Sequence, residues 1–310
     1  MDQRWDAPRV DLYRTPDSRF ADLVGFPYEP GYADVAGLRM AWVEAGPADG
    51  PTVVLLHGQP TWSYLYRTVI PVLTDAGVHV VAPDLVGFGR SDKPTSPRDY
   101  SYARHVAWTR ELLFEAMDLR EVTLVGQDWG GLIGLRLVAE HPERFARVVA
   151  TNTGLPTGHQ KVSEVFRRFR DYVASATDLP VGAIVRGGCL HGLSDAEVAA
   201  YDAPFPEPRA KAGARVLPSL VPASPDDPAA DDQRRAWESL AHFNKPFLCA
   251  FSDGDPITRG ADAPMRKLIP GSAGQPHCTI TGAGHFVQED AGERLGTIVR
   301  DVMLGTGAAG

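Results

Sequence analysis

The chain alternates short, wholly apolar runs with longer segments in which apolar positions follow helical spacing. An apolar run without polar alternation is typical of a strand buried on both faces, as in a parallel sheet. Strands that alternate with helices predict a doubly wound, mostly parallel α/β sheet, which binds ligands beyond the carboxyl ends of its strands. The strand-like pieces cover residues 32–35, 38–44, 53–56, 78–82, 122–125, 148–150, 246–251 and 278–280, and the helical segments cover residues 65–76, 102–117 and 132–140.

This rhythm stops after about Leu155 and returns only near residue 246. Residues 156–235 contain helical stretches, proline-rich joints and an acidic loop, but no clean apolar run. We therefore expect a core formed by residues 1–155 and 236–310, with residues 156–235 inserted as a helical cap.

The stretch VGQDWGG, residues 125–131, joins a predicted strand to a predicted helix through a glycine-rich turn. The nucleophile elbow of hydrolases has this context, with the nucleophile at the tip of the turn. Here the tip is Asp128. An aspartate before a helix can also be a simple N-cap, but the flanking Gly126, Gly130 and Gly131 favour a strained, closely packed turn.

Two further polar residues follow predicted strands. Asp255 lies in the turn SDGDP and precedes a proline, so it is a better candidate than Asp253 to point away from its strand. His285 follows Gly-Ala-Gly, which lets its loop bend back over the sheet. The order Asp128, Asp255, His285 is the hydrolase order of nucleophile, acid and base. We expect His57 only to shape the turn after its strand.

A carboxylate nucleophile restricts the reaction. Aspartate has a reference pKa of about 3.9, so at neutral pH it attacks without a base and forms an ester with a carbon that carries a leaving group. Histidine is then free to activate water against that ester. The indole N–H of Trp129 could stabilise a departing halide, and the backbone N–H groups of Gln59 and Trp129 could form the oxyanion hole. An epoxide would instead need a proton donor, usually tyrosine.

Composition excludes several other classes of function. The net charge is −8, with no basic cluster, which argues against nucleic acid or an anionic membrane as partner. The three cysteines include no C-x-x-C pair, and no histidine pair has zinc-site spacing, so we expect neither a disulfide framework nor a metal. Residues 1–9 lack the apolar core of a signal peptide, which makes the cytoplasm the expected location.

With these motifs the sequence resembles the haloalkane dehalogenases of the α/β-hydrolase fold, and in particular the subfamily with an Asp-His-Asp triad. The resemblance implies that Asp128 is the nucleophile, His285 the base, Asp255 the acid and Trp129 a halide donor. Asn152 occupies the alternative acid position and is neutral. The resemblance also implies a cis Gln59–Pro60 bond, a small apolar halogenated substrate, halide and water, no cofactor, and a monomer. The matching blocks are RTPDSRF (14–20), HGQPTWSYLYR (57–67), PDLVGFGRSDKP (83–94), QDWGG (127–131), YDAPFP (201–206) and GHFVQED (284–290).

The chain departs from this family at two positions. Gln59 stands where the family most often has Glu or Asn, which changes how a water or halide would be placed. The second halide-binding tryptophan of the cap is missing, because Phe166 stands at the expected position and its ring has no N–H. We expect weaker halide binding, or a different donor, and a pocket lined by Phe166, Phe169, Leu217 and Pro218.

Two other functions remain open from the sequence alone. An epoxide hydrolase uses the same aspartate nucleophile, and the cap supplies Tyr172 and Tyr201. A ligand receptor on a hydrolase fold would need no turnover, but the intact set of Asp128, Asp255 and His285 argues against it.

Overall fold

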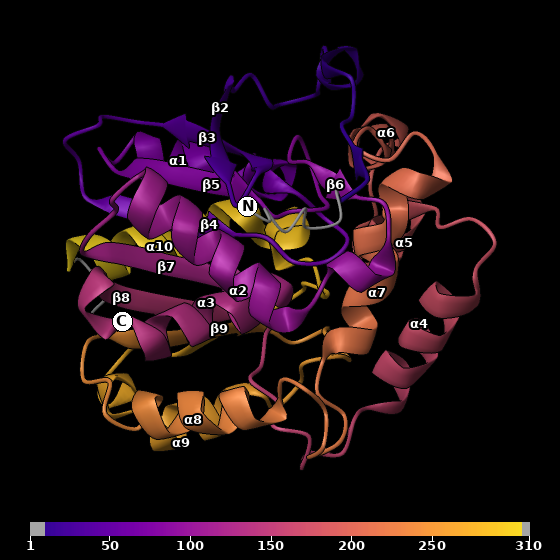
Figure 1. Cartoon of the computed structure of the whole chain (residues 1–310). Helices are drawn as coiled ribbons and strands as arrows, with labels where there is room; N and C mark the ends of the chain where they lie inside the picture. The colour runs from indigo at the N-terminus through magenta and orange to yellow at the C-terminus, as the bar shows by residue number, and fades with distance from the viewer. Residues whose placement is uncertain (1–9, 306–310) are drawn as a thin grey trace, which may run out of the picture.

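The computed structural model describes residues 10–305, and its centre is an eight-stranded sheet. The strand order is β10-β9-β8-β7-β4-β5-β3-β2 (Figure 1). β2 and β5 each pair antiparallel with β3, and all other neighbours in this sheet are parallel. The strands are β2 (Pro30–Val35), β3 (Leu38–Ala45), β4 (Thr52–Leu56), β5 (His79–Asp84), β7 (Val122–Gln127), β8 (Phe145–Thr151), β9 (Phe247–Ser252) and β10 (Cys278–Ile280). The predicted doubly wound, mostly parallel sheet is confirmed.

The central strands form where the sequence is apolar on both faces. All six residues of β7 and of β5 are buried, including the polar Thr123 and Gln127. A strand covered on both sides requires such a run, because either face would otherwise place apolar side chains in water. A separate two-stranded ribbon pairs β1 (Leu12–Tyr13) with β6 (Lys93–Pro94).

Helices cover both faces of the sheet. α1 packs with α10, while α2, α3 and α8 pack together; α2 lies in front of the sheet in Figure 1 and α10 behind it. Two predicted helices are interrupted: residues 65–76 form a 3-10 turn (Ser63–Tyr66) before α1, and residues 102–117 change from α2 into a π-helix (Glu111–Ala116). The helices are α1 (Val69–Thr74), α2 (Tyr102–Arg110), α3 (Trp129–Glu140), α8 (Ala230–Leu240), α9 (Asp262–Leu268) and α10 (Val287–Leu304).

The segment expected to be a cap is helical and contains no strand between residues 156 and 235, all of which are described. It forms α4 (Glu164–Ser175), α5 (Val181–Gly188), α6 (Asp195–Asp202) and α7 (Ala212–Leu220), which gather at one side of the molecule in Figure 1. The expected boundary at residue 235 falls inside α8, which packs on α3. We propose α4–α7 as the cap over the carboxyl ends of the strands.

Residues 1–9, for which the sequence predicted no signal peptide, lie outside the described residues. Between residues 10 and 305, none of the helices combines the length and the apolar character that crossing a bilayer requires.

Candidate active site

Asp128 lies at the tip of the sharp turn between β7 and α3. Its φ is 49° and its ψ is −124°, a backbone conformation that non-glycine residues rarely adopt. Such strain costs about 1–3 kcal/mol and persists only where the surroundings hold it. The backbone N–H of Asp128 donates to the Asn152 carbonyl at 2.9 Å, and its carbonyl accepts from the Thr153 hydroxyl at 2.8 Å. Its side chain makes no N-cap hydrogen bond, so it is free for another role.

The glycines of the elbow are required by close approach. A Cβ on Gly130 would lie 2.0 Å from the carbonyl oxygen of Leu56. A Cβ on Gly131 would lie 2.2 Å from Oγ1 of Thr153, the hydroxyl that binds the Asp128 carbonyl. The predicted strained turn is therefore present, and Gly130 and Gly131 are needed for its packing.

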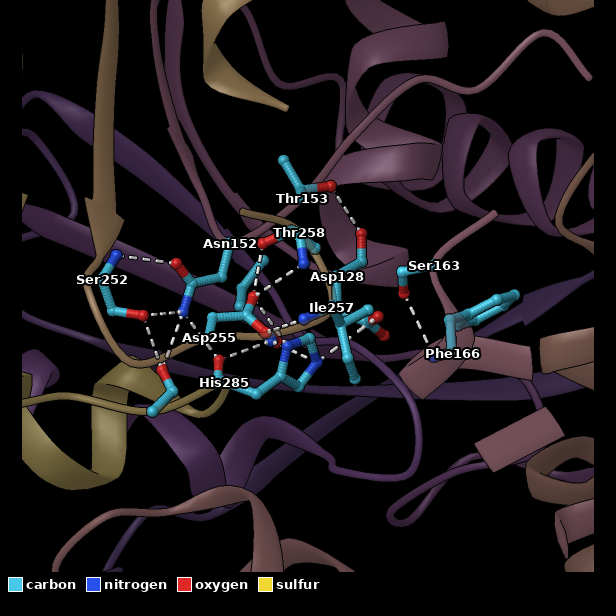
Figure 2. A network of polar contacts seen from close by, with 12 residues as sticks. Asp128, Asn152, Thr153, Ser163, Phe166, Ser252, Asp255, Ile257, Thr258 and His285 are labelled. Carbon is cyan, nitrogen blue, oxygen red and sulfur yellow. Dashed lines mark hydrogen bonds and ion pairs between the residues drawn. The ribbon is translucent and has the colours of Figure 1, made fainter. Parts of the chain in front are cut away.

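The structure brings Asp128, Asp255 and His285 together. Nδ1 of His285 lies 3.1 Å from Oδ2 of Asp255, and Nε2 lies 3.6 Å from Oδ2 of Asp128. Figure 2 shows the imidazole between the two carboxylates. The side chain of Asp255 is fully buried, and that of His285 is 7% exposed. One imidazole can therefore contact both carboxylates at once.

The carboxylate of Asp255 is held by its own turn. It accepts a hydrogen bond from the Ile257 N–H at 2.8 Å and another from the Thr258 hydroxyl. Burial alone would raise the pKa of Asp255, but His285 and these donors outweigh it and lower the pKa to about 2. Asp253 instead accepts from the Gly282 N–H at 2.9 Å as an ordinary turn residue.

The two carboxylates control the charge of His285. Burial disfavours its imidazolium, but Asp255 and Asp128 outweigh burial and raise the pKa of His285 to about 10. His57 differs: it is fully buried, its Nε2 accepts from the Leu85 N–H at 2.9 Å, and burial lowers its pKa. His57 thus ties two loops together, as a turn-shaping residue would.

Gln59 reaches Asp128 through its backbone. Its N–H donates to Oδ1 of Asp128 at 2.8 Å, where an oxyanion-hole donor would stand. Its side-chain Nε2 donates to the Ala214 carbonyl of α7 at 2.8 Å, so that amide nitrogen faces the cap helix. The peptide bond between Gln59 and Pro60 is cis, as expected.

Trp129 follows Asp128 in the chain and packs against two rings of α2. Its ring lies 5.0 Å from the Tyr102 ring and 6.1 Å from that of His105, measured between centroids. Burial lowers the pKa of His105 to about 3, so this neighbour is a neutral ring. Within residues 10–305 the indole N–H of Trp129 has no hydrogen-bond partner.

A cavity of about 510 Å³ opens above Asp128. Its walls come from the loops after β8 and β9 and the start of α4, with further residues from α3, α8 and α9 and from the segment that follows α7. Of the four predicted pocket residues, only Phe166 lines it. Phe169 packs against the core, and Leu217 and Pro218 are buried inside α7. The lining includes Leu132, Thr153, Leu155, Val162, Phe166, Val221, Trp237, Ile257 and Arg259.

Comparison with known proteins places the chain in a family. A model of the α/β hydrolase fold matches residues 51–292. A haloalkane dehalogenase of Psychrobacter cryohalolentis is 50% identical, over 94% of this chain and 97% of that protein. Haloalkane dehalogenase 1 of Mycobacterium tuberculosis is 53% identical, over 92% of this chain and 96% of its own. The chain belongs to the haloalkane dehalogenase family. The resemblance found in the sequence is confirmed.

Solved structures of haloalkane dehalogenases agree with the fold. The tetrameric enzyme of Paraglaciecola agarilytica has a TM-score of 0.87 at 35% identity and covers 97% of this chain and 100% of its own. The enzyme of Bradyrhizobium elkani has a TM-score of 0.78 at 27% identity. The match covers 89% of this chain and 98% of that enzyme.

The two cap tyrosines do not support the epoxide alternative. Tyr201 is buried and its hydroxyl donates to Glu289, which also binds Arg67. Tyr172 is 45% exposed on α4. Neither lines the cavity that contains Asp128, and the Tyr201 hydroxyl is already bound to Glu289, so neither stands ready to protonate a leaving oxygen.

Sequence reasoning did not recognise two residues that position the histidine loop. The side-chain Nε2 of Gln127 donates to the His285 carbonyl at 3.2 Å and lies 3.2 Å from Nε2 of the same ring. Asn152, noted only as a neutral acid position, donates to the carbonyls of Gly284 and His285, each at 2.9 Å. Their signal was position: Gln127 is the last residue of β7, next to Asp128, and Asn152 directly follows β8.

Proposed function

We propose that this chain hydrolyses haloalkanes to an alcohol, a halide ion and a proton, with Asp128 as the nucleophile. A carboxylate oxygen of Asp128 attacks the carbon that bears the halogen, and the carbon–halogen bond breaks as an alkyl ester forms. The observation that carries this proposal is the position of Asp128, at the floor of a largely apolar cavity and within reach of His285.

His285 then acts as the base in ester hydrolysis. Its Nε2 takes a proton from water, and the hydroxide adds to the ester carbonyl carbon of Asp128. The Gln59 N–H, already 2.8 Å from Oδ1, stabilises the resulting oxyanion, and the Trp129 N–H is the second donor in this proposal. Collapse of the intermediate breaks the bond to the alkyl oxygen, which takes the proton back from His285 and leaves as the alcohol. The acid form of Asp128 then loses a proton and becomes a carboxylate again.

The electrostatics of the site suit this sequence of steps. Asp128 is one of the two carboxylates that raise the pKa of His285. Alkylation turns Asp128 into a neutral ester, so Asp128 no longer raises the pKa of His285, and that pKa falls. His285 thereby becomes a base in the state in which a base is required. Asp255, buried and ionised, keeps the ring oriented with Nδ1–H toward it.

The departing halide needs a donor in a dry site. Trp129 offers an indole N–H that is unpartnered within the described residues. Phe166 lines the cavity without an N–H, so the proposed site has one indole donor. Losing a comparable oxyanion donor costs about 2.7–4 kcal/mol in other enzymes, which sets the scale of the expected loss of halide stabilisation.

The direct test is bromide release from 1,2-dibromoethane and 1-bromohexane, with styrene oxide assayed for diol in parallel. We expect bromide from the wild type, none from Asp128→Ala, and no diol. Diol without bromide would assign the site to epoxide hydrolysis. Ligand binding with neither product would favour the receptor function.

Assembly and location belong to the same proposal. We propose a monomer that acts in the cytoplasm, whereas the related enzyme of Paraglaciecola agarilytica is described as a tetramer. Light scattering coupled to gel filtration measures the mass directly: a value near 33.5 kDa supports the monomer, and four times that mass would contradict it.

A further inference from the structure

A second hollow of about 280 Å³ adjoins the cavity above Asp128, and we call it the cationic pocket. Three residues, Gln160, Lys161 and Val162, line both spaces, so the two are neighbours. The remaining lining residues of the cationic pocket are Arg167, Arg170 and Ala223. Arg167 and Arg170 are three positions apart on α4, so they occupy the same face of that helix.

The charge of this pocket is largely uncompensated. Lys161 and the Arg167 guanidinium have no ion pair or side-chain hydrogen bond in the described part of the chain. Nε of Arg170 lies 3.6 Å from Oδ1 of Asp171, so this guanidinium has a partner. Arg259, on the catalytic cavity, donates to the Asp253 carbonyl at 3.1 Å, which leaves its charge unpaired by a carboxylate.

Two acidic residues close in sequence to the lining residues are occupied elsewhere. Glu164 pairs with Arg168, and Asp227 accepts from the backbone N–H groups of Ala223 and Ser224 at 2.6 and 2.8 Å. The sequence predicted no basic cluster, so this group of positive charges corrects that expectation for a chain whose net charge is −8. Guanidinium and ammonium groups bind carboxylates through charge-assisted hydrogen bonds, so the cluster suits an anionic group.

We propose that the cationic pocket binds a carboxylate at the far end of the substrate, so that the enzyme prefers ω-halocarboxylates to neutral haloalkanes of equal length. This inference rests on the proposed function. The orientation follows from charge: Asp128 repels a carboxylate at the cavity floor, whereas Lys161 and Arg167 attract one at the other end. Leu132, Leu155 and Val221 between them contact the methylene chain.

The test compares 6-bromohexanoate with 1-bromohexane, which share a chain length and a leaving group. We expect kcat/KM for the acid to exceed that for the neutral substrate by about tenfold, the scale of one hydrogen bond to a charged group. Arg167→Gln and Lys161→Gln should each remove most of this advantage. Arg167 lines only the cationic pocket, so Arg167→Gln should also leave 1-bromohexane within twofold. A series of ω-bromo acids should show an optimum length, set by the distance from Asp128 to the pocket.

Arg168→Gln is the matched control. Arg168 lies on the same helix, is 80% exposed and pairs with Glu164, but does not line the pocket. It removes the same charge from α4, so it should leave the preference unchanged. If Arg168→Gln reduces the preference as much as Arg167→Gln, the effect is the general field of the helix and the pocket is not a binding site.

Binding without turnover separates the two proposals. Hexanoate should bind the wild type in calorimetry, and Arg167→Gln should weaken that binding about tenfold. Equal kcat/KM for both substrates, with no hexanoate binding, would overturn the carboxylate site and leave the dehalogenase function intact. Hexanoate binding that depends on Arg167, without bromide release from any substrate, would support the pocket and overturn the proposed function.

Discussion

Nε2 of His285 lies 3.6 Å from Oδ2 of Asp128, slightly beyond hydrogen-bond distance. The imidazole is anchored from its other side, where Nδ1 meets Asp255 at 3.1 Å. Nε2 therefore faces the carboxylate of Asp128 but does not form a hydrogen bond with it. In the proposed reaction the nucleophile can therefore be alkylated while the histidine stays in place to activate water.

Removing the base should divide the reaction into its two halves. In His285→Gln, Asp128 keeps its carboxylate and the oxyanion-hole N–H of Gln59, so alkylation continues, whereas ester hydrolysis slows by about 10²–10⁴-fold. Rapid mixing with 1,2-dibromoethane should release one equivalent of bromide per enzyme, and mass spectrometry should find the alkyl ester on Asp128. Asp128→Asn is the control and should give neither. A variant that turns over at the normal rate would exclude His285 as the base.

The pH dependence of stability follows from the raised pKa of His285. Its pKa is about 10 in the folded protein and about 6.5 when unfolded, so the folded state holds the proton more tightly. The stabilisation is fully present below about pH 6.5 and is lost as pH rises toward 10. Urea unfolding from pH 6 to 10 should show a decline for the wild type that is smaller for His285→Gln. If the free energy of unfolding declines equally in the two proteins, the ion pairs of His285 with Asp128 and Asp255 do not stabilise the fold.

The sequence predicted the sheet and the proximity of the three candidate residues, because each prediction rests on a local signal. Apolar runs identify strands buried on both faces, and the loops after parallel strands converge at one edge, so Asp128, Asp255 and His285 could be brought together without a structure. The pocket residues had no such signal. Whether Phe166 or Phe169 of α4 faces the cavity depends on how that helix packs on α7, which is a tertiary contact.

The contrast between local signals and tertiary contacts also explains why the predicted cap boundary at residue 235 falls inside α8 and why two predicted helices are interrupted. Helical spacing of apolar residues does not reveal whether a helix packs on the cap or on α3. It also does not distinguish a π-turn from regular helix, because both bury Leu112 and Leu113. Gln127 is polar yet fully buried in β7, and only the folded structure shows that it contacts His285.

The elbow should not tolerate a methyl group at Gly131. A Cβ there would lie 2.2 Å from Oγ1 of Thr153, so Gly131→Ala should lower the free energy of unfolding by about 1–3 kcal/mol and reduce bromide release. Gly187→Ala is the control, because a Cβ at that helical position meets nothing within 4 Å. We expect that change to stabilise the protein by about 0.5–1 kcal/mol. Urea unfolding measures both, and equal effects would show that the turn is not tightly packed.

Halide binding should depend on Trp129. Trp129→Phe keeps an aromatic ring at this position but removes the N–H, so the turnover number should fall by about 10²–10³-fold and bromide should inhibit less strongly. Trp237→Phe is the matched control: Trp237 lines the cavity, and its N–H already donates to the Leu155 carbonyl at 2.7 Å. Phe166→Trp should act in the opposite direction, because it places an indole in the cap beside the cavity. The inhibition constant of bromide, measured with 1-bromohexane, checks all three. An unchanged constant in Trp129→Phe would mean that another group holds the halide.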